Sequence, residues 1–321
     1  MYKAALIGLG NIAWKLGRDY VSGSSLSHKA AFEKNHKVKL VAGYSPDNME
    51  VQNFSQSCGV NGYVSLEKML QQENPDIISI CSPQEYHADQ LEKCIGYNVP
   101  MIWLEKTATT SASKSKKLEN LRTQSTVTST ILVNFQRRYT ESYQKLRQVI
   151  KNNLYGKTLL VEVNYSRGLV VNGSHMIDML AYLFPDSPFD LLWAERNCQH
   201  DSPDFLIQIE SDLIAHVCGI NASYHNIDII VTCEQARFSI LHGGMSTRVE
   251  EVQENDMFVG YYRLYDKEKG ELGIPGFSHA FDKALENLID SYENENEPES
   301  NMKTAIKSQV LIEKVLKSRV Q

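Results

Sequence analysis

Long apolar runs, paired cysteines and a basic excess are all missing from this sequence. No stretch reaches the roughly 18 consecutive apolar residues of a membrane span, so we expect none. The opening residues 1–8 lack the layout of a signal peptide. The six cysteines form no C-x-x-C pair and the nine histidines no paired ligand motif. These absences predict reduced thiols, a cytoplasmic protein and no metal site.

The charge balance excludes further classes of protein. A net charge of −6 disfavours a nucleic-acid binder, which normally carries a basic field. Charged residues make up 22% and apolar residues 42% of the chain, which argues against overall disorder and allows two packed cores. At roughly 100–200 residues per domain, 321 residues predict two domains. We place them at residues 1–130 and 131–321.

Strand and helix signals alternate through the first domain. The helical stretches include residues 65–72 and 87–97, and near-continuous apolar runs lie around them. Such runs are typical of parallel strands that are covered on both faces. The pattern therefore predicts an α/β fold with a doubly wound parallel sheet. The expected strands are residues 3–7, 37–42, 76–81, 99–104 and 126–134.

The second domain changes character after residue 156. An alternating stretch at 157–166 is followed by a helix at 175–183, and residues 210–212 are expected to form a hairpin turn. Helical spacing returns at 277–292 and again before the C-terminus. We therefore expect an α+β domain with a large open, mostly antiparallel sheet. Its further strands are expected at residues 191–196, 205–209, 213–217, 227–232, 236–241 and 247–252.

A glycine-rich turn directly follows the first strand. Residues Gly8, Leu9, Gly10, Asn11, Ile12 and Ala13 match G-x-G-x-x-G/A. Gly8 permits the tight turn, Gly10 lets a pyrophosphate approach the backbone, and Ala13 allows close helix–strand packing. The N–H groups of the following helix, starting near Asn11 and Ile12, are then available to phosphates. In this context the motif predicts a dinucleotide-binding domain of the Rossmann type.

The end of the second strand bears on which dinucleotide binds. An acid that binds the ribose hydroxyls is expected there, and Ser45 stands in its place. A small neutral side chain leaves room for a 2′-phosphate, although no arginine follows to hold it. Asp47 is displaced by two residues and is expected to cap the next helix. The sequence thus leans towards NADP and leaves NAD open.

Four further segments resemble motifs of the Gfo/Idh/MocA family of oxidoreductases. The first two resemble a (C/T)-x-P-N-x-x-H loop and an E-K-P motif, and the others an N-R-R-F-like segment and a G-x-H-x-x-D helix start. Together with the glycine turn they cover nearly the whole chain. The segments are Cys81–His87, Trp103–Thr107, Asn134–Tyr139 and Asn172–Asp178.

The resemblance implies particular residues and ligands. It implies a homo-oligomer, a dimer or a tetramer, whose second domain often pairs through its sheet. The likeness is strongest to members found with surface-polysaccharide genes, which share an insert, here Trp14–Ser27, after the glycine turn. A sugar or nucleotide-sugar substrate is therefore expected, with no nucleic acid or membrane as partner. Cofactor contacts are implied for Cys81, Ser82, Pro83, His87, Glu105 and Lys106.

Hydride transfer from an alcohol requires a group that takes the hydroxyl proton. The resemblance puts Lys106 near the nicotinamide, although it could instead be a surface lysine paired with Glu105. His175 is the candidate general acid/base because histidine titrates near neutral pH, the alternative being a core histidine. Asp178 lies one helical turn further on the same face, where it would orient the ring, bind a sugar hydroxyl or bond to backbone.

The chain also departs from the family pattern. Val171 stands where many members have an aspartate, and Thr107 replaces the proline of E-K-P. These changes indicate either a reduced catalytic set or a different substrate. Cys81 is expected to pack rather than act as a nucleophile. The candidate substrate contacts are Gln136, Arg138, Tyr165, Arg167 and Asn172, each with a structural role as the alternative.

Three functions remain open at this point. The first is an NAD(P)-dependent dehydrogenase or reductase acting on a CH–OH group of a sugar-type substrate. The second is a regulatory or sensor protein that binds dinucleotide without turnover, which the loss of the acid at Val171 keeps open. The third is reduction of an imine or a conjugated double bond. We also expect the Gly- and Ser-rich insert Trp14–Ser27 to close over nicotinamide or substrate.

Overall fold

The computed structural model describes residues 1–16, 24–125, 128–195, 200–267, 272–273 and 276–318. Most of the predicted closing insert, residues 17–23, lies outside the described residues. The chain divides into two compact units. The first unit comprises Met1–Gln136 and Ser278–Ile306, and the second comprises Arg137–Phe277 and Lys307–Gln321.

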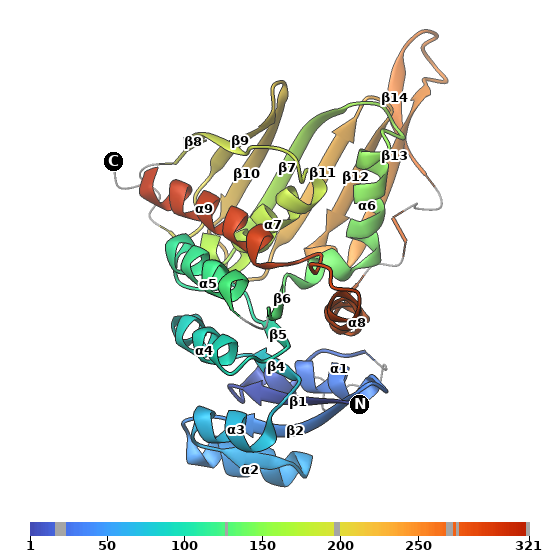
Figure 1. Cartoon of the computed structure of the whole chain (residues 1–321). Coiled ribbons are helices and arrows are strands. Elements are labelled where there is room, and N and C mark those ends of the chain that lie inside the picture. Colours follow the sequence, from blue (N-terminus) through green and yellow to red (C-terminus); the bar gives the residue numbers. More distant parts are fainter. Residues whose placement is uncertain (17–23, 126–127, 196–199, 268–271, 274–275, 319–321) are drawn as a thin grey trace. The chain divides into compact units, whose positions relative to one another are not determined.

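A six-stranded parallel sheet forms the centre of the first unit (Figure 1). Its strand order, β3-β2-β1-β4-β5-β6, is that of the Rossmann fold. The predicted doubly wound sheet is confirmed, and the short β3 is an addition that its polar sequence did not indicate. The strands are β1 (Tyr2–Ile7), β2 (Val38–Tyr44), β3 (Asn61–Tyr63), β4 (Ile77–Ile80), β5 (Met101–Leu104) and β6 (Thr130–Val133).

Helices cover both faces of this sheet. On one face, α3, α4 and α5 bury their apolar residues against alternate strand residues such as Ile78 and Ile102. On the other face Trp103 contacts Phe32 of α1 and Phe281 of α8, which explains why β4 and β5 have no polar face. The helices are α1 (His28–Lys34), α2 (Asn48–Cys58), α3 (Leu66–Glu73), α4 (Gln84–Gly96), α5 (Ala112–Gln124) and α8 (Ala280–Glu293).

The division into domains at residue 130 needs correction. The first unit runs on to Gln136, and the later segment Ser278–Ile306 returns to it. Helix α8 lies in that segment and packs against α1, β5 and β6. Its apolar stripe was visible in the sequence, but the stripe does not say which sheet it covers. The assignment of α8 to the first unit was therefore decided by tertiary packing.

The second unit contains an eight-stranded sheet in the order β14-β13-β12-β11-β7-β10-β9-β8. All its neighbouring strands pair antiparallel except β7 and β10, which run parallel. The predicted α+β domain and the turn at residues 210–212 are confirmed. The strands are β7 (Thr158–Ser166), β8 (Asp190–Ala194), β9 (Phe205–Glu210), β10 (Leu213–Ile220), β11 (Ile227–Cys233), β12 (Ala236–Leu241), β13 (Ser246–Glu254) and β14 (Tyr262–Asp266).

Helices cover one face of this sheet (Figure 1). They are α6 (Glu141–Lys151), α7 (Ser174–Leu183) and the part of α9 (Met302–Ser318) that belongs to this unit. Every residue of α7 is buried, and alternate residues of β7 and β11 face the same core. The alternation of apolar and polar residues along these strands thus indicates a sheet with one packed face.

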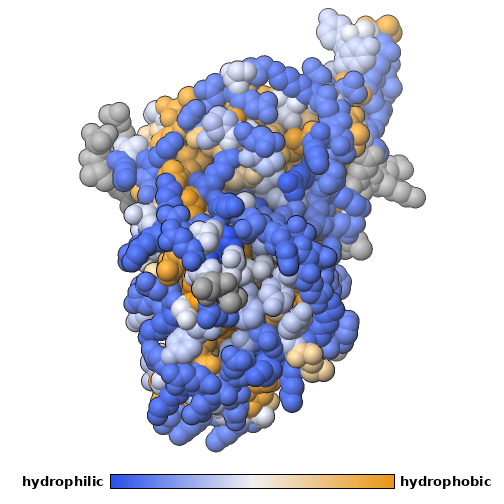
Figure 2. Space-filling view, viewed as in Figure 1, coloured by the Kyte–Doolittle hydropathy of each residue, from blue (hydrophilic) through white to orange (hydrophobic). Residues whose placement is uncertain are grey.

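The hairpin that joins β13 to β14 carries exposed apolar side chains at its tip. Figure 2 shows hydrophobic colouring there, at the upper right of the view. Val259 is 90% exposed, which is unusual for a residue of its type and marks the tip as a candidate contact surface. The other large apolar residues at the tip are Met257, Phe258, Tyr261 and Tyr262.

Candidate functional site

The glycine turn after β1 has the backbone that its sequence predicts. Gly8 has a φ of +82°, and a Cβ there would lie 2.6 Å from the backbone nitrogen of Ser82. Gly8 is therefore required by the fold itself. A Cβ on Gly10 would meet nothing within 4 Å, so the missing side chain there leaves open space. Ala13 is completely buried, as close packing requires.

The helix that follows the turn is shorter than expected. Asn11–Lys15 forms a single π-helical segment, η1, and α-helical structure starts at His28 in α1. Asn11 is exposed and Ile12 half-buried. Tryptophan 14 at the start of the insert donates its indole N–H to the carbonyl of Leu9 at 2.8 Å, which ties the short segment to the turn.

A cavity of about 800 Å³ opens beside the turn at the carboxyl ends of β1, β2 and β4. In a doubly wound sheet this is where ligands bind, at the point where the strand order reverses. Six of the predicted cofactor residues line it: Gly8, Gly10, Ser45, Cys81, Ser82 and Pro83. The cavity also takes in Leu9, Tyr44, Pro46, Asp47, Glu50, Tyr86 and Gln90. Asn11, Ile12, Ala13, His87, Glu105 and Lys106 do not line it.

Two carboxylates that follow β2 in the sequence line this cavity, Asp47 before α2 and Glu50 on it. Asp47 caps α2, accepting hydrogen bonds from the backbone nitrogens of Met49 and Glu50, as predicted. The hydroxyl of Ser45, which is 2% exposed, donates to a carboxylate oxygen of Glu50 at 2.8 Å. Glu50 was missed because it lies on the helix, five residues beyond Ser45. No lysine or arginine is among the residues described as lining the cavity.

The loop after β4 is held by a buried histidine. The two ring nitrogens of His87 each lie 2.9 Å from a backbone carbonyl oxygen, one of Thr107 and one of Ser82. His87 is 1% exposed, so it supports the cavity wall instead of touching a ligand there. Burial raises the pKa of the Cys81 thiol well above its usual value, which keeps it protonated and supports a packing role.

Glu105 is the centre of a buried polar network behind Lys106. Its Oε1 accepts hydrogen bonds from Nε2 of His28 at 2.9 Å and from the side-chain amide of Asn134 at 2.6 Å. The other ring nitrogen of His28 lies 3.0 Å from the hydroxyl of Ser79. Burial would raise the pKa of Glu105, but the His28 hydrogen bond and charge, Asn134 and Lys106 outweigh it, so the pKa is lowered. The carboxylate thus stays charged and fixed.

Lys106 follows this network at the carboxyl end of β5. The side chain is half-buried, and the peptide bond between Lys106 and Thr107 is cis. The backbone nitrogen of Lys106 lies 3.3 Å from Oε2 of Glu105. Glu105 therefore links the side chains of His28 and Asn134 to the backbone of Lys106.

The predicted helix start of the second unit is found at α7. His175 is 9% exposed, and the π-helical segment η3 (Leu169–Gly173) leads into it. Val171, at the position of the family aspartate, is 52% exposed. Asn172 lies 3.2 Å from Nδ1 of His225 through its side-chain nitrogen.

Asp178 does not serve as a free carboxylate beside His175. It accepts a bidentate pair of hydrogen bonds from Arg138, Nε to Oδ2 at 2.8 Å and Nη2 to Oδ1 at 2.6 Å. Asp178 is 0% and Arg138 2% exposed. The structure shows a buried ion pair between these two residues, and the roles predicted for them in catalysis and substrate binding stay predictions. The pairing spans 40 positions, so no local pattern could reveal it.

We expect Asp178→Ala to lower the free energy of unfolding by about 3–5 kcal/mol, because it leaves the Arg138 guanidinium buried without its counter-charge. Urea denaturation of the purified protein measures this. Asp212→Ala, which removes a carboxylate from the exposed pair with Lys157, is the matched control and should change little. Equal effects of the two substitutions would contradict a structural role for the Arg138–Asp178 pair.

The remaining candidate substrate residues differ in accessibility. Tyr165 is completely buried and donates its hydroxyl to the carbonyl of Pro203 at 2.7 Å, which favours the structural role that was the alternative to a substrate contact. Arg167 is exposed with a φ of +61°, just after β7. In the first unit, Gln136 is half-buried. Sequence reasoning passed over Arg137 and His225, which both belong to the second unit.

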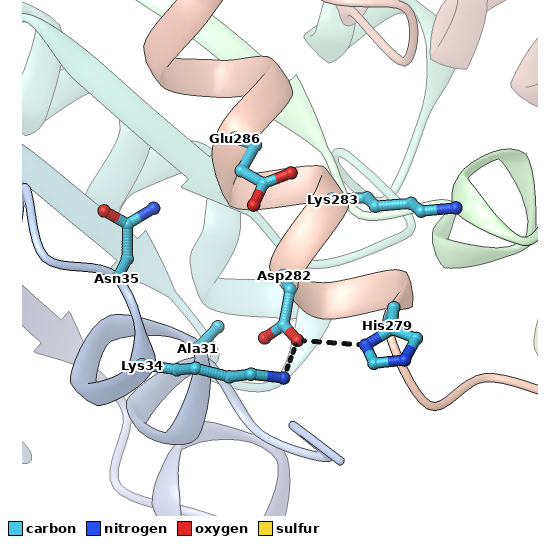
Figure 3. Close-up of a pocket in the computed structure, with 7 residues that line it drawn as sticks. All are labelled: Ala31, Lys34, Asn35, His279, Asp282, Lys283 and Glu286. Carbon is cyan, nitrogen blue, oxygen red and sulfur yellow. Dashed lines mark hydrogen bonds and ion pairs between the residues drawn. The ribbon is translucent and has the colours of Figure 1, made fainter. Parts of the chain in front are cut away.

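A second cavity in the first unit, of about 400 Å³, lies between α1 and α8 (Figure 3). Its carboxylate Asp282 is paired at 2.5 Å with Lys34 and at 3.6 Å with His279. Lys283 and Glu286 also line this cavity, and none of its lining residues belongs to the glycine turn. The glycine turn lines the larger cavity, beside Gly10.

Two further findings bear on the predicted absences. Within the described ranges, no three His, Cys, Asp or Glu side chains are grouped so that they could hold a metal ion. None of the helices in the described part of the chain combines the length and apolar character needed to cross a bilayer.

Comparison with known proteins gives a family match and several structural likenesses. Residues 2–133 match the GFO_IDH_MocA family model, described as an oxidoreductase family with an NAD-binding Rossmann fold. The inositol 2-dehydrogenase of Pseudarthrobacter chlorophenolicus is 24% identical over 244 residues, which are 69% of this chain and 68% of that protein.

Two solved structures resemble nearly the whole chain. One is the WlbA dehydrogenase from Chromobacterium violaceum in complex with NADH and UDP-GlcNAcA, at 18% identity and a TM-score of 0.77, covering 99% of this chain and 94% of that one. The other is KijD10, a 3-ketoreductase from Actinomadura kijaniata in complex with NADP and TDP-benzene, at 13% identity and a TM-score of 0.77, covering 99% and 97%. At these identities the likeness establishes the fold of both units.

The family match falls on the glycine turn and the parallel sheet that border the cavity beside Gly10. The similar structures share the fold of the second unit as well. Residues 2–133 of this chain are therefore similar to the NAD-binding Rossmann fold of the Gfo/Idh/MocA family of oxidoreductases.

Proposed function

We propose that this chain transfers a hydride to or from a secondary alcohol or ketone of a sugar or nucleotide sugar, with a nicotinamide dinucleotide as cofactor. The observation that carries the proposal is the bare backbone at Gly10, which faces a cavity of about 800 Å³ at the switch point of the sheet. The cavity size and the absence of a Cβ fit a dinucleotide whose pyrophosphate approaches the turn. The relatives named above are sugar-type dehydrogenases and ketoreductases, which supports the substrate class.

A residue of the chain must accept or donate the proton of this reaction. Oxidation of an alcohol releases a hydride from carbon and a proton from oxygen, and the bound nicotinamide supplies or accepts the hydride. We assign the proton to Lys106 or His175, acting on the substrate oxygen. The buried pairing of Glu105 with His28 holds the segment before Lys106 rigid, which favours a fixed position for the ammonium group.

The direct test is turnover with a panel of substrates. Purified protein is mixed with NAD or NADP and with myo-inositol, D-glucuronate or UDP-sugars, and the nicotinamide absorbance is followed. We expect reduction of the cofactor with at least one polyol or sugar. Cofactor binding without turnover on any substrate would favour the alternative, a sensor that binds dinucleotide, which the exposed Val171 in place of an acid supports.

The second proposal concerns the choice of cofactor. The sequence leaned towards NADP because Ser45 is small and neutral, but its hydroxyl is bonded to Glu50. The carboxylates of Glu50 and Asp47 both line the cavity, where a ribose 2′-hydroxyl can donate to them and a 2′-phosphate is repelled. We therefore propose NAD as the preferred cofactor.

We expect Glu50→Gln to shift the ratio of NAD to NADP affinity towards NADP by about tenfold, because it removes one of the two repelling charges. Calorimetric titration with each dinucleotide measures the shift. Glu92→Gln on the exposed side of α4 is the matched control and should leave the ratio unchanged. A wild-type protein that prefers NADP, or a Glu50→Gln variant with an unchanged ratio, would refute this assignment.

A further inference from the structure

Arg137 is a buried cation of the second unit, and no carboxylate in the described part of the chain is paired with it. It is 4% exposed, and its Nε has no hydrogen-bond partner among the described residues. Its neighbour in sequence, Arg138, is the opposite case, because it donates two hydrogen bonds to the carboxylate of Asp178. Burying a cation without an opposite charge is costly, so such an arginine in a native structure calls for an explanation.

The groups packed around Arg137 do not neutralise it. Its Cζ lies 5.2 Å from the ring centroid of Phe277, a favourable contact that leaves the charge in place. Tyr143 is a further neighbour, and burial raises its pKa to about 12, so the phenol stays uncharged. Burial correspondingly lowers the pKa of Arg137, and the phenol of Tyr143 is the group that opposes this shift.

An imidazole borders the same space. A Cβ built on Gly243 would lie 3.4 Å from Nε2 of His225 and 3.7 Å from Nη2 of Arg137. The imidazole and the guanidinium therefore face one small volume above a glycine whose φ is +72°. His225 is exposed, which gives this volume a route to solvent. Its pKa is lowered by burial and by the charges of Arg137 and Arg167.

We propose that Arg137 and His225, with the side-chain amide of Asn172, form an anion subsite that binds a carboxylate or phosphate group of the substrate. A guanidinium suits both groups because it offers two parallel donors. Asn172 already contacts His225 and lies three residues before His175. This deepens the proposed function and rests on it: the substrate would carry its negative charge close in sequence to the proposed acid/base.

The experiment is calorimetric titration of the protein, saturated with NAD, with three probes. D-Glucuronate carries a sugar carboxylate, UDP carries a diphosphate, and D-glucose is neutral. We expect the wild-type protein to bind one or both anions, and Arg137→Gln to weaken that binding at least about tenfold. Binding of glucuronate assigns a carboxylate to the subsite, whereas binding of UDP alone assigns a diphosphate.

Matched variants separate a local effect from a general one. Arg263→Gln removes the same charge from an exposed position on β14 and should leave anion binding unchanged. If Arg137→Gln fails to fold, His225→Gln at the exposed edge replaces it, with an expected loss of about threefold. The proposal is overturned if the wild-type protein binds neither anion, or if the variant that folds binds as tightly as the wild type.

The outcome is independent of whether the proposed reaction occurs. The titrations are repeated without NAD, so the subsite is tested even if the dinucleotide does not bind. Failure of NAD binding or turnover would overturn the proposed function and leave an Arg137-dependent affinity for anions intact. Loss of the anion effect with normal turnover would overturn only the subsite.

Discussion

Lys106→Met lowers kcat by about a thousandfold or more, within the range of 10² to 10⁴ that a positioned acid or base contributes. The substitution keeps the length and the apolar stem of the side chain but removes the group that handles the proton of the substrate oxygen. Lys106 does not line the cavity beside Gly10, so the dissociation constant for NAD should change by less than about threefold.

The measurement pairs steady-state kinetics with calorimetric titration of NAD. Lys117→Met, on the exposed side of α5, removes an equal charge and should leave both quantities unchanged. A Lys106→Met enzyme that keeps a tenth or more of the wild-type kcat would contradict the catalytic role proposed for Lys106. His175 would then be left to handle the proton.

Gly10→Ala weakens dinucleotide binding by at least about tenfold without destabilising the protein. The backbone of Gly10 has a φ of −78°, which alanine adopts freely, and a Cβ there meets no protein atom within 4 Å. The methyl group would instead occupy the space through which we propose that the pyrophosphate approaches. The midpoint of thermal unfolding without cofactor should therefore match the wild type.

Gly8→Ala provides the contrast within the same turn. Its φ of +82° is unfavourable for alanine, and the new Cβ would lie 2.6 Å from the nitrogen of Ser82. We expect this variant to lose about 2 kcal/mol or more of stability, seen in urea denaturation. Unchanged NAD affinity of Gly10→Ala would show that the turn does not hold the pyrophosphate, and the proposed cofactor site would fall with it.

Much of the fold could be predicted because its signals are local. Continuous apolar runs such as residues 76–81 mark strands covered on both faces, and alternating stretches such as 157–166 mark strands covered on one. The turn at Gly8 and Gly10 is equally local, since it depends on backbone freedom at two positions. β3 was not predicted because its three residues are too few, and too polar, to show the alternating or continuous apolar pattern of a strand.

The candidate site was predicted less completely, because its side chains are chosen by contacts across the chain. Two adjacent arginines look alike in sequence, yet Arg138 pairs with Asp178 and Arg137 does not. Glu50 enters the cavity from a helix, where no strand-end pattern would place it. His28 supports Glu105 from 77 positions away.

By itself the sequence determined the two kinds of sheet, the glycine turn and the resemblance to an oxidoreductase family, since each depends on neighbouring residues. Only the tertiary structure decided which of two adjacent arginines pairs with Asp178, that Glu50 lines the cavity beside Gly10, and which unit holds α8. The physical reason is that burial and pairing of charges depend on what surrounds a side chain in space, and a chain order alone does not specify those surroundings.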